Sequence, residues 1–258
     1  MQWVTIFKKE LLEDWRNFKW IWVPIVFILI SIMDPLSTYY LPKILDTVGG
    51  LPEGTVMEFP DTPPTAVLFM TLSELSMFGV LVVVLISMGI ISGERKSGVA
   101  ELVLVKPVSY LTYITSKWTA KLVLIFVSYL IGMITCWYYV NLLFGNVSLG
   151  TVVKVILFYG LWLILILTIT VFFNTLFKSP GVVGFVSIGV IILMSVINKI
   201  FSHVLTWFPN NLSSYILKMM DTGEVSSELW GTSLVTVLLI IILLFSSFFT
   251  FKGKEMAN

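Results

Sequence analysis

The sequence predicts an all-α polytopic membrane protein with six transmembrane helices. The chain has 258 residues, of which 57% are hydrophobic and 12% charged, whereas soluble domains are about half apolar and about a quarter charged. The apolar residues form six runs, most of them near the roughly 20 residues that cross a bilayer. The stretches between the runs are too short for a soluble domain, so we treat residues 1–258 as one transmembrane domain.

The composition also excludes several kinds of site. Cys136 is the one cysteine and His203 the one histidine in the sequence, so neither an intramolecular disulfide nor a His-based metal site is expected. A net charge of +1 gives no reason to expect a nucleic-acid partner. The sequence has no Gly-x-x-x-x-Gly-Lys-Ser/Thr phosphate loop, so we expect a chain that is not an enzyme and does not hydrolyse ATP by that route.

Residues 1–18 predict an amphipathic elbow helix. Its aromatic and apolar side chains recur every three or four residues: Trp3, Phe7, Leu11, Trp15 and Phe18. Charged side chains fall largely between them. We interpret this segment as a helix on the cytoplasmic membrane surface, with its aromatic residues among the lipid headgroups. The alternative is a helix packed on the rest of the protein.

The first span is expected over residues 19–41. The charge-free run 20–33 has 14 residues and reaches only about 21 Å as a helix, short of the ~30 Å hydrocarbon core. The span therefore has to take in Asp34, which would lie near the outer rim or in a cavity. Pro24 and Pro35 allow kinks. An acidic loop, residues 42–64, follows on the external side.

The second span, residues 66–91, contains Glu74. An intramembrane carboxylate is costly and usually faces protein or water. Glu74 is a candidate for a translocation path, together with Asp34, but a structural pairing with a neighbouring helix is favoured over the path. A plain interfacial position is the third alternative.

The remaining spans are expected over residues 118–144, 152–176, 181–200 and 232–251. The external segment 201–231 separates the last two, and Ser214–Met220 within it predicts a short amphipathic helix. Asn174 and Asn198 are interpreted as residues that hydrogen-bond between helices. Six spans with both termini inside place twelve of the sixteen Lys and Arg residues on the cytoplasmic side, as the positive-inside rule requires.

Residues 92–117 form the longest of the cytoplasmic connections. The stretch from Ile90 to Lys121 carries five cations against two anions. Ser92 or Gly93 is suited to cap a helix, with Glu94 near the positive end of its dipole. Lys106-Pro107 predicts the end of that helix, which would have about three turns.

This stretch resembles the first cytoplasmic loop of ABC-2 type transporter permeases, the membrane subunits of bacterial ABC exporters. The residues that carry the resemblance are Gly93, Glu94, Arg95, Lys96, Gly98, Glu101, Leu102, Pro107, Val108, Ser109 and Lys117. In that family the loop holds a coupling helix that docks into a groove of a separate ATPase. The resemblance therefore implies that Glu94, Arg95, Gly98, Glu101, Leu102 and Pro107 couple this chain to an ATPase. Loop charges in water are the alternative for Glu94 and Arg95.

The resemblance implies a permease subunit in the bacterial cytoplasmic membrane that exports cargo. Two ATPase subunits would bind ATP and Mg, with no cofactor in this chain, and a second permease, identical or paralogous, would complete the path. Few charges in the spans favour a lipophilic or amphipathic cargo, such as an antimicrobial or toxin-like peptide, a drug or a lipid-linked molecule. The alternatives are an ion-coupled secondary transporter, for which Glu74 is thin support, and a membrane-anchored assembly or sensor protein.

Overall fold

The computed structural model describes residues 2–48, 62–99 and 108–255. Within these ranges all regular structure is helical and no strand occurs. Six segments are long and apolar enough to cross a membrane, which confirms the prediction of a six-span all-α protein. The candidate spans are Lys19–Ile44, Pro64–Lys96, Tyr110–Leu143, Leu149–Leu176, Pro180–Phe201 and Ser227–Gly253.

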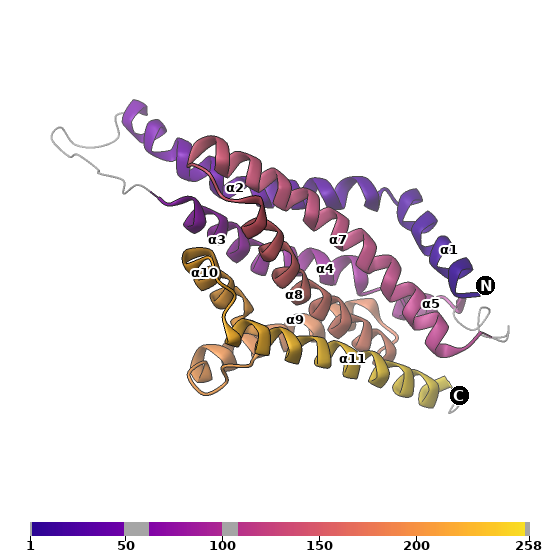
Figure 1. Ribbon diagram of the computed structural model, residues 1–258. Helices are drawn as coiled ribbons and strands as arrows, with labels where there is room; N and C mark the ends of the chain where they lie inside the picture. The colour runs from indigo at the N-terminus through magenta and orange to yellow at the C-terminus, as the bar shows by residue number, and fades with distance from the viewer. Residues whose placement is uncertain (1, 49–61, 100–107, 256–258) are drawn as a thin grey trace.

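The spans run side by side as an elongated bundle (Figure 1). Both termini lie at one end of it, together with α5, and α10 lies at the other. The helices labelled in Figure 1 are α1 (Gln2–Arg16), α2 (Lys19–Val48), α3 (Pro64–Glu74), α4 (Val80–Ser87), α5 (Ser92–Lys96), α7 (Tyr110–Leu143), α8 (Leu149–Leu176), α9 (Pro180–Phe201), α10 (Leu212–Thr222) and α11 (Ser227–Glu255).

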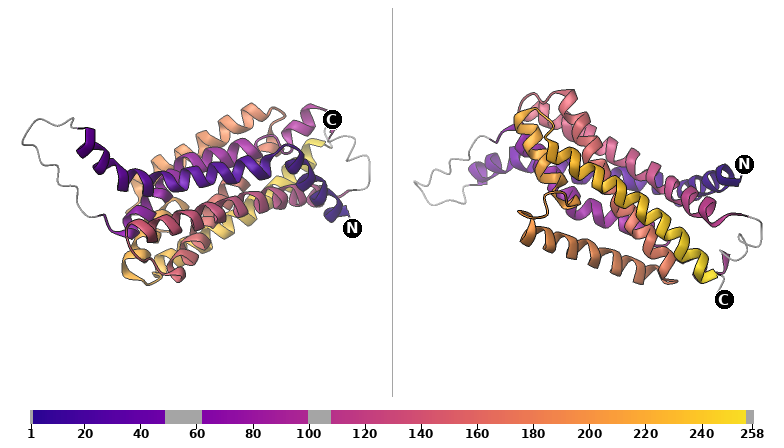
Figure 2. Two further views of the ribbon diagram at one scale, coloured as in Figure 1. Left: turned by 90° about the horizontal axis from the view of Figure 1, so that it is seen from above. Right: turned by 60° about the horizontal axis from the view of Figure 1, so that its bottom comes forward.

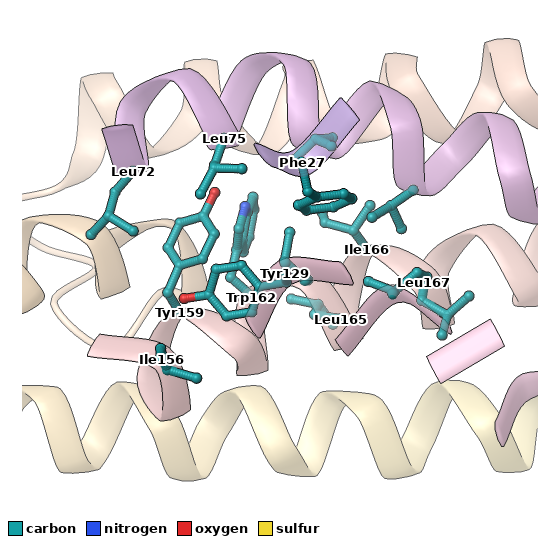
Figure 3. Packing of buried hydrophobic residues seen from close by; sticks show 14 of the residues in the cluster. Phe27, Leu72, Leu75, Tyr129, Ile156, Tyr159, Trp162, Leu165, Ile166 and Leu167 are labelled. Carbon is teal, nitrogen blue, oxygen red and sulfur yellow. The ribbon is translucent and has the colours of Figure 1, made fainter. Parts of the chain in front are cut away.

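The core of the bundle surrounds α8, the most buried of the six spans. Aromatic rings from α2, α7 and α8 meet there, among them Phe27, Tyr129 and Tyr159, each fully buried (Figure 3). α2 packs closely along α7, and a Cβ at Gly132 would lie 2.9 Å from the backbone oxygen of Phe27. Because no side chain fits at that distance, glycine sets the spacing of these two helices.

The second span is not the continuous helix that residues 66–91 predicted. A π-helix, Leu75–Gly79, follows α3, and α4 ends at Ser87, before a turn that leads into α5. Both irregularities are held by α8. The Ser76 hydroxyl group lies 3.0 Å from the Tyr159 hydroxyl, and Asn174 binds the turn. A hydropathy pattern cannot predict either contact, because Tyr159 and Asn174 lie far from the second span in sequence.

Some helix boundaries also differ from the sequence-based expectation. The sequence predicts a loop over residues 92–117, but α7 already begins at Tyr110, because the Ser109 hydroxyl accepts a hydrogen bond from the Thr112 N–H at 3.1 Å. Lys117 is therefore helical rather than a loop residue. α2 continues to Val48 and α11 begins at Ser227. The short helix expected over Ser214–Met220 is confirmed as α10, whereas its position outside the cell stays a prediction.

α9 is among the least buried of the spans. It follows α8 after a short turn and lies along one side of the bundle (Figure 2, right). Several large apolar side chains on it are exposed, of which Phe185 is the most extreme at 80%. Such a surface suits lipid or a protein partner rather than water.

Candidate functional site

Eight charged side chains meet at the end of the bundle that carries both termini. We call this group the ion cluster: Lys9, Glu10, Glu13 and Asp14 of α1, Lys19 of α2, Glu94 of α5, and Lys117 and Lys121 of α7. Its four carboxylates and four ammonium groups balance. The cluster joins four helices, of which α1, α5 and α7 are far apart in sequence.

Glu94 lies at the centre of the cluster. One of its carboxylate oxygens is 2.6 Å from the Lys9 ammonium group and 2.9 Å from that of Lys117. The other accepts a hydrogen bond from the Tyr113 hydroxyl at 2.5 Å. Lys117 also binds Glu10 at 2.6 Å. Glu94 therefore ties α5 to both α1 and α7, and its side chain is only 15% exposed.

A second group of ion pairs lies one turn further along α1. Asp14 is fully buried and accepts from Lys121, which is itself buried, and from Lys19 at 3.1 Å. Charged groups at such depth are costly unless they are paired. The charged face of α1 consequently lies against α7, and Trp15 and Phe18 point outward, 64% and 67% exposed.

The packing of α1 on the rest of the protein agrees with the second alternative for the elbow helix. The charged residues make this contact, while Trp15 and Phe18 lie on the other side of the segment, and contact of these rings with lipid headgroups stays a prediction. Burial lowers the pKa of Lys9, but the hydrogen bond to Glu94 and the nearby carboxylates outweigh it and raise the pKa above its ordinary value. Lys9 therefore stays charged at neutral pH.

Carboxylate oxygens of Glu10, Glu13 and Glu94 lie within 4.8 Å of one another, close enough to share a cation. Lys9 and Lys117 already supply the positive charge at this place. The ion cluster borders a polar cavity of about 200 Å³, which has room for water molecules that would satisfy remaining donors and acceptors. The arrangement is that of a polar joint between helices rather than of a metal centre.

The turn before α5 is held by one amide. The Asn174 side-chain oxygen accepts hydrogen bonds from the backbone N–H groups of Ile91, at 3.2 Å, and Ser92, at 3.0 Å. Its nitrogen donates to the backbone oxygen of Ser87 at 3.0 Å. The helix cap expected from Ser92 or Gly93 is thus wrong: α5 is capped from α8, and the Ser92 hydroxyl donates to the Met88 backbone oxygen instead.

Arg95 adds a second contact between α5 and α8. It is 8% exposed, donates to the backbone oxygen of Thr175 at 3.0 Å, and lies over the ring of Phe251 at 5.5 Å. Neither Arg95 nor Glu94 is a loop charge in water, so that alternative is wrong for both. Their role toward an ATPase stays a prediction.

The prediction of a single helix of three turns after residue 92 is wrong for residues 92–99, the part of it that the structure describes. α5 ends at Lys96, and Gly98 adopts a left-handed conformation with φ of 75°, which favours glycine over residues with a Cβ. The chain therefore turns at Gly98, directly after the short helix that carries Glu94 and Arg95. Glu101, Leu102 and Pro107 lie outside the described residues.

Two comparisons with known proteins bear on the identity of the chain. Residues 51–257 match the family described as "Protein of unknown function (DUF2705)". The chain belongs to the DUF2705 family. It is also 32% identical over 241 residues to the "Uncharacterized transmembrane protein YxlG" of Bacillus subtilis (strain 168), covering 93% of each protein.

The DUF2705 match contains Glu94, Lys117, Lys121 and Asn174, but not α1 with its acidic side chains. It thus covers one side of the ion cluster only. Sequence reasoning missed the cluster because Lys117 and Glu10 are 107 positions apart. The charged residues of α1 between its aromatic ones indicate that the helix has a polar side to bury. They do not indicate which helix this side packs against.

The other two candidates in this DUF2705 protein, Asp34 and Glu74, lie on neighbouring helices. α2 packs on α3, and the two carboxylates are close enough for their charges to interact. Both side chains are half-buried. Among the described residues none forms a hydrogen bond or ion pair with the Glu74 side chain. The structural pairing favoured for Glu74 is therefore not seen among the described residues.

Replacing Glu74 with glutamine is expected to leave the melting temperature unchanged or to raise it, because the substitution removes the repulsion with Asp34 without breaking a pair. Thermal unfolding of the detergent-purified protein measures this. Asp34→Asn is the matched variant and should act in the same direction. A lower melting temperature for Glu74→Gln would show that the carboxylate stabilises the bundle after all.

Proposed function

We propose that this DUF2705 protein is the transmembrane permease subunit of an ATP-driven ABC-type exporter in the bacterial cytoplasmic membrane, with both termini in the cytoplasm. One observation carries the proposal. The second span ends and the third begins at the end of the bundle where α1 and both termini lie, and the sequence between these two spans is polar. The concentration of Lys and Arg at that end supports a cytoplasmic position, where an ATPase can reach it.

The contacts of α5 support a role in transmitting movement. Glu94 ties α5 to α1 and α7, and Arg95 ties it to α8. A partner that pushes on this segment would act on three helices directly. Contact with the partner itself falls to exposed residues nearby, Lys96 and Val99 among them, and to the coupling residues Glu101, Leu102 and Pro107.

The remaining parts of the assembly follow from the resemblance to ABC-2 type permeases. Two copies of an ATPase would bind ATP and Mg, since this sequence has no phosphate loop. A second permease subunit, identical or paralogous, would complete the path. The apolar spans favour a lipophilic or amphipathic cargo: an antimicrobial or toxin-like peptide, a drug or a lipid-linked molecule.

Two glycines provide a matched test of the coupling segment. Gly98 and Gly223 have nearly the same φ, 75° and 76°, and a Cβ at either would meet no atom within 4 Å. They lie at opposite ends of the bundle (Figure 1). Replacing either with alanine should cost about 1–2 kcal/mol through the left-handed backbone, so the two variants should unfold at similar temperatures.

The proposal predicts that the two variants differ in partner binding. The tagged wild-type chain, purified from native membranes in mild detergent, should carry an ATPase with a phosphate loop and its ATPase activity. Gly98→Ala should lower the amount of bound ATPase and its activity at least severalfold, while Gly223→Ala should retain both. A wild-type chain that purifies without any ATPase, or equal retention by both variants, would contradict the proposal.

A further inference from the structure

A second site, unrelated to the ion cluster, lies between the second span and α9. It is an apolar cleft of about 560 Å³, which we call the α9 cleft. Its walls are the π-helix and the start of α4 on one side and the second half of α9 on the other. For comparison, an apolar cavity of about 150 Å³ already binds a small hydrocarbon.

The dimensions of the α9 cleft match one leaflet of a bilayer. Its walls on α9 extend from Ile188 to Lys199, about 16 Å at 1.5 Å per residue. Half of the ~30 Å hydrocarbon core is about 15 Å. An acyl chain that reaches from the headgroup level to the bilayer midplane would therefore fill the cleft along its length.

The side chains around the cleft leave it open to a hydrocarbon ligand. Met77, Ile192 and Val196 line it and are themselves 62%, 57% and 49% exposed, so the cleft is accessible from the side where lipid would lie. The hydroxyl groups of Ser73 and Ser195 donate to backbone oxygens of their own helices. Because these hydroxyl groups already have acceptors, an apolar ligand can lie along the walls without leaving them unpaired.

One charge lies at the end of the cleft. Lys199 is exposed and belongs to the last turn of α9. No carboxylate lines the cleft, and within the described ranges no hydrogen bond or ion pair is formed by Lys199. A headgroup with net negative charge would meet a cation there, whereas the ammonium group of a zwitterionic headgroup would find no carboxylate.

We propose that the α9 cleft binds an anionic phospholipid of the bilayer, with one acyl chain between the π-helix and α9 and the headgroup phosphate at Lys199. The charge, the length and the lateral opening of the cleft all fit this ligand. The site does not depend on the exporter proposal, because a membrane protein of any function can hold a lipid in this way. Lipid bound here would fill the space between α9 and the rest of the bundle.

Lipid retention measured by native mass spectrometry tests the proposal. The purified protein is titrated with phosphatidylglycerol and, separately, with phosphatidylethanolamine of the same acyl chains. The wild type should retain more phosphatidylglycerol than phosphatidylethanolamine. Lys199→Gln should reduce this preference about fivefold, the usual effect of one lysine near anionic headgroups.

Two further variants separate the cleft from general surface charge. Lys154, on α8 near the same end of the bundle, does not line the cleft, so Lys154→Gln should keep the preference. Ile192→Trp should fill the cleft and lower retention of both lipids, with the oligomeric state unchanged. Equal retention of the two lipids by the wild type, or equal losses in both lysine variants, would overturn the proposal. It would also be overturned if Ile192→Trp dissociated an oligomer without affecting lipid, since a second copy would then occupy the cleft.

Discussion

Replacing Lys117 with methionine is expected to lower the free energy of unfolding by about 3–5 kcal/mol, the usual cost of removing one partner from a buried ion pair. Lys117 is 1% exposed and binds Glu10 at 2.6 Å and Glu94 at 2.9 Å. Without it, the ion pairs of the Glu10 carboxylate with residues that the structure describes are reduced to the more distant Lys9, at 3.3 Å. Reversible unfolding in mixed detergent micelles measures the loss.

Lys96→Met is the matched control, because Lys96 lies nearby on α5 and is exposed. It should change stability by less than about 0.5 kcal/mol. The double variant Glu10→Gln/Lys117→Met should recover part of the loss, since one of the two carboxylates that lose Lys117 is then neutral. If Lys117→Met unfolded like Lys96→Met, the ion cluster would not hold α1 and α5 to the bundle.

Asn174→Leu is expected to have an effect of similar size. The substitution keeps the number and branching of the side-chain heavy atoms but leaves the N–H groups of Ile91 and Ser92 without their acceptor. Each buried, unpaired group costs about 1–3 kcal/mol. The turn between α4 and α5 should then open, so that amide hydrogen exchange at Ile91 and Ser92 rises along with the loss of stability.

Asn17→Leu provides the control for introducing an apolar residue. Asn17 is exposed between α1 and α2, and its replacement should leave both stability and exchange near α5 unchanged. Protection of Ile91 and Ser92 that stays at the wild-type level in Asn174→Leu would mean that the turn is held by other contacts. In the exporter that we propose, opening this turn should also uncouple ATP hydrolysis from movement of α8.

The ion pairs of Glu94 with Lys9 and Lys117 make a charge reversal at Glu94 unsuitable as a test of ATPase docking alone. As a loop residue, Glu94 would lose only a contact to the ATPase when changed to lysine. In the structure a lysine there would face the ammonium groups of Lys9 and Lys117, so α1 and α7 would be repelled as well. Gly98→Ala is the cleaner variant for partner docking, because it disturbs neither the ion cluster nor the contacts of Asn174.

The sequence alone was sufficient for the class of protein and for most of its elements. Six apolar runs of spanning length can satisfy their backbone groups in lipid only as helices, so hydropathy predicted the six spans. The helical period is local as well, and it predicted α1. The cap at Ser109, which starts α7 at Tyr110, is a local signal that the prediction of a loop over residues 92–117 missed. The short helix α10 also followed from its own residues.

Tertiary structure decided which way the charged residues face. Lys117 and Lys121 are loop markers by the positive-inside rule, yet both are buried in α7, because Glu10 and Asp14 of α1 neutralise them across 107 positions. α5 is short because Asn174 caps it from α8 and Gly98 turns the chain after it. Pairings between distant segments leave no periodic pattern in the sequence, since each partner alone reads as an ordinary charged or polar residue. Only the packing of the helices shows that these residues meet.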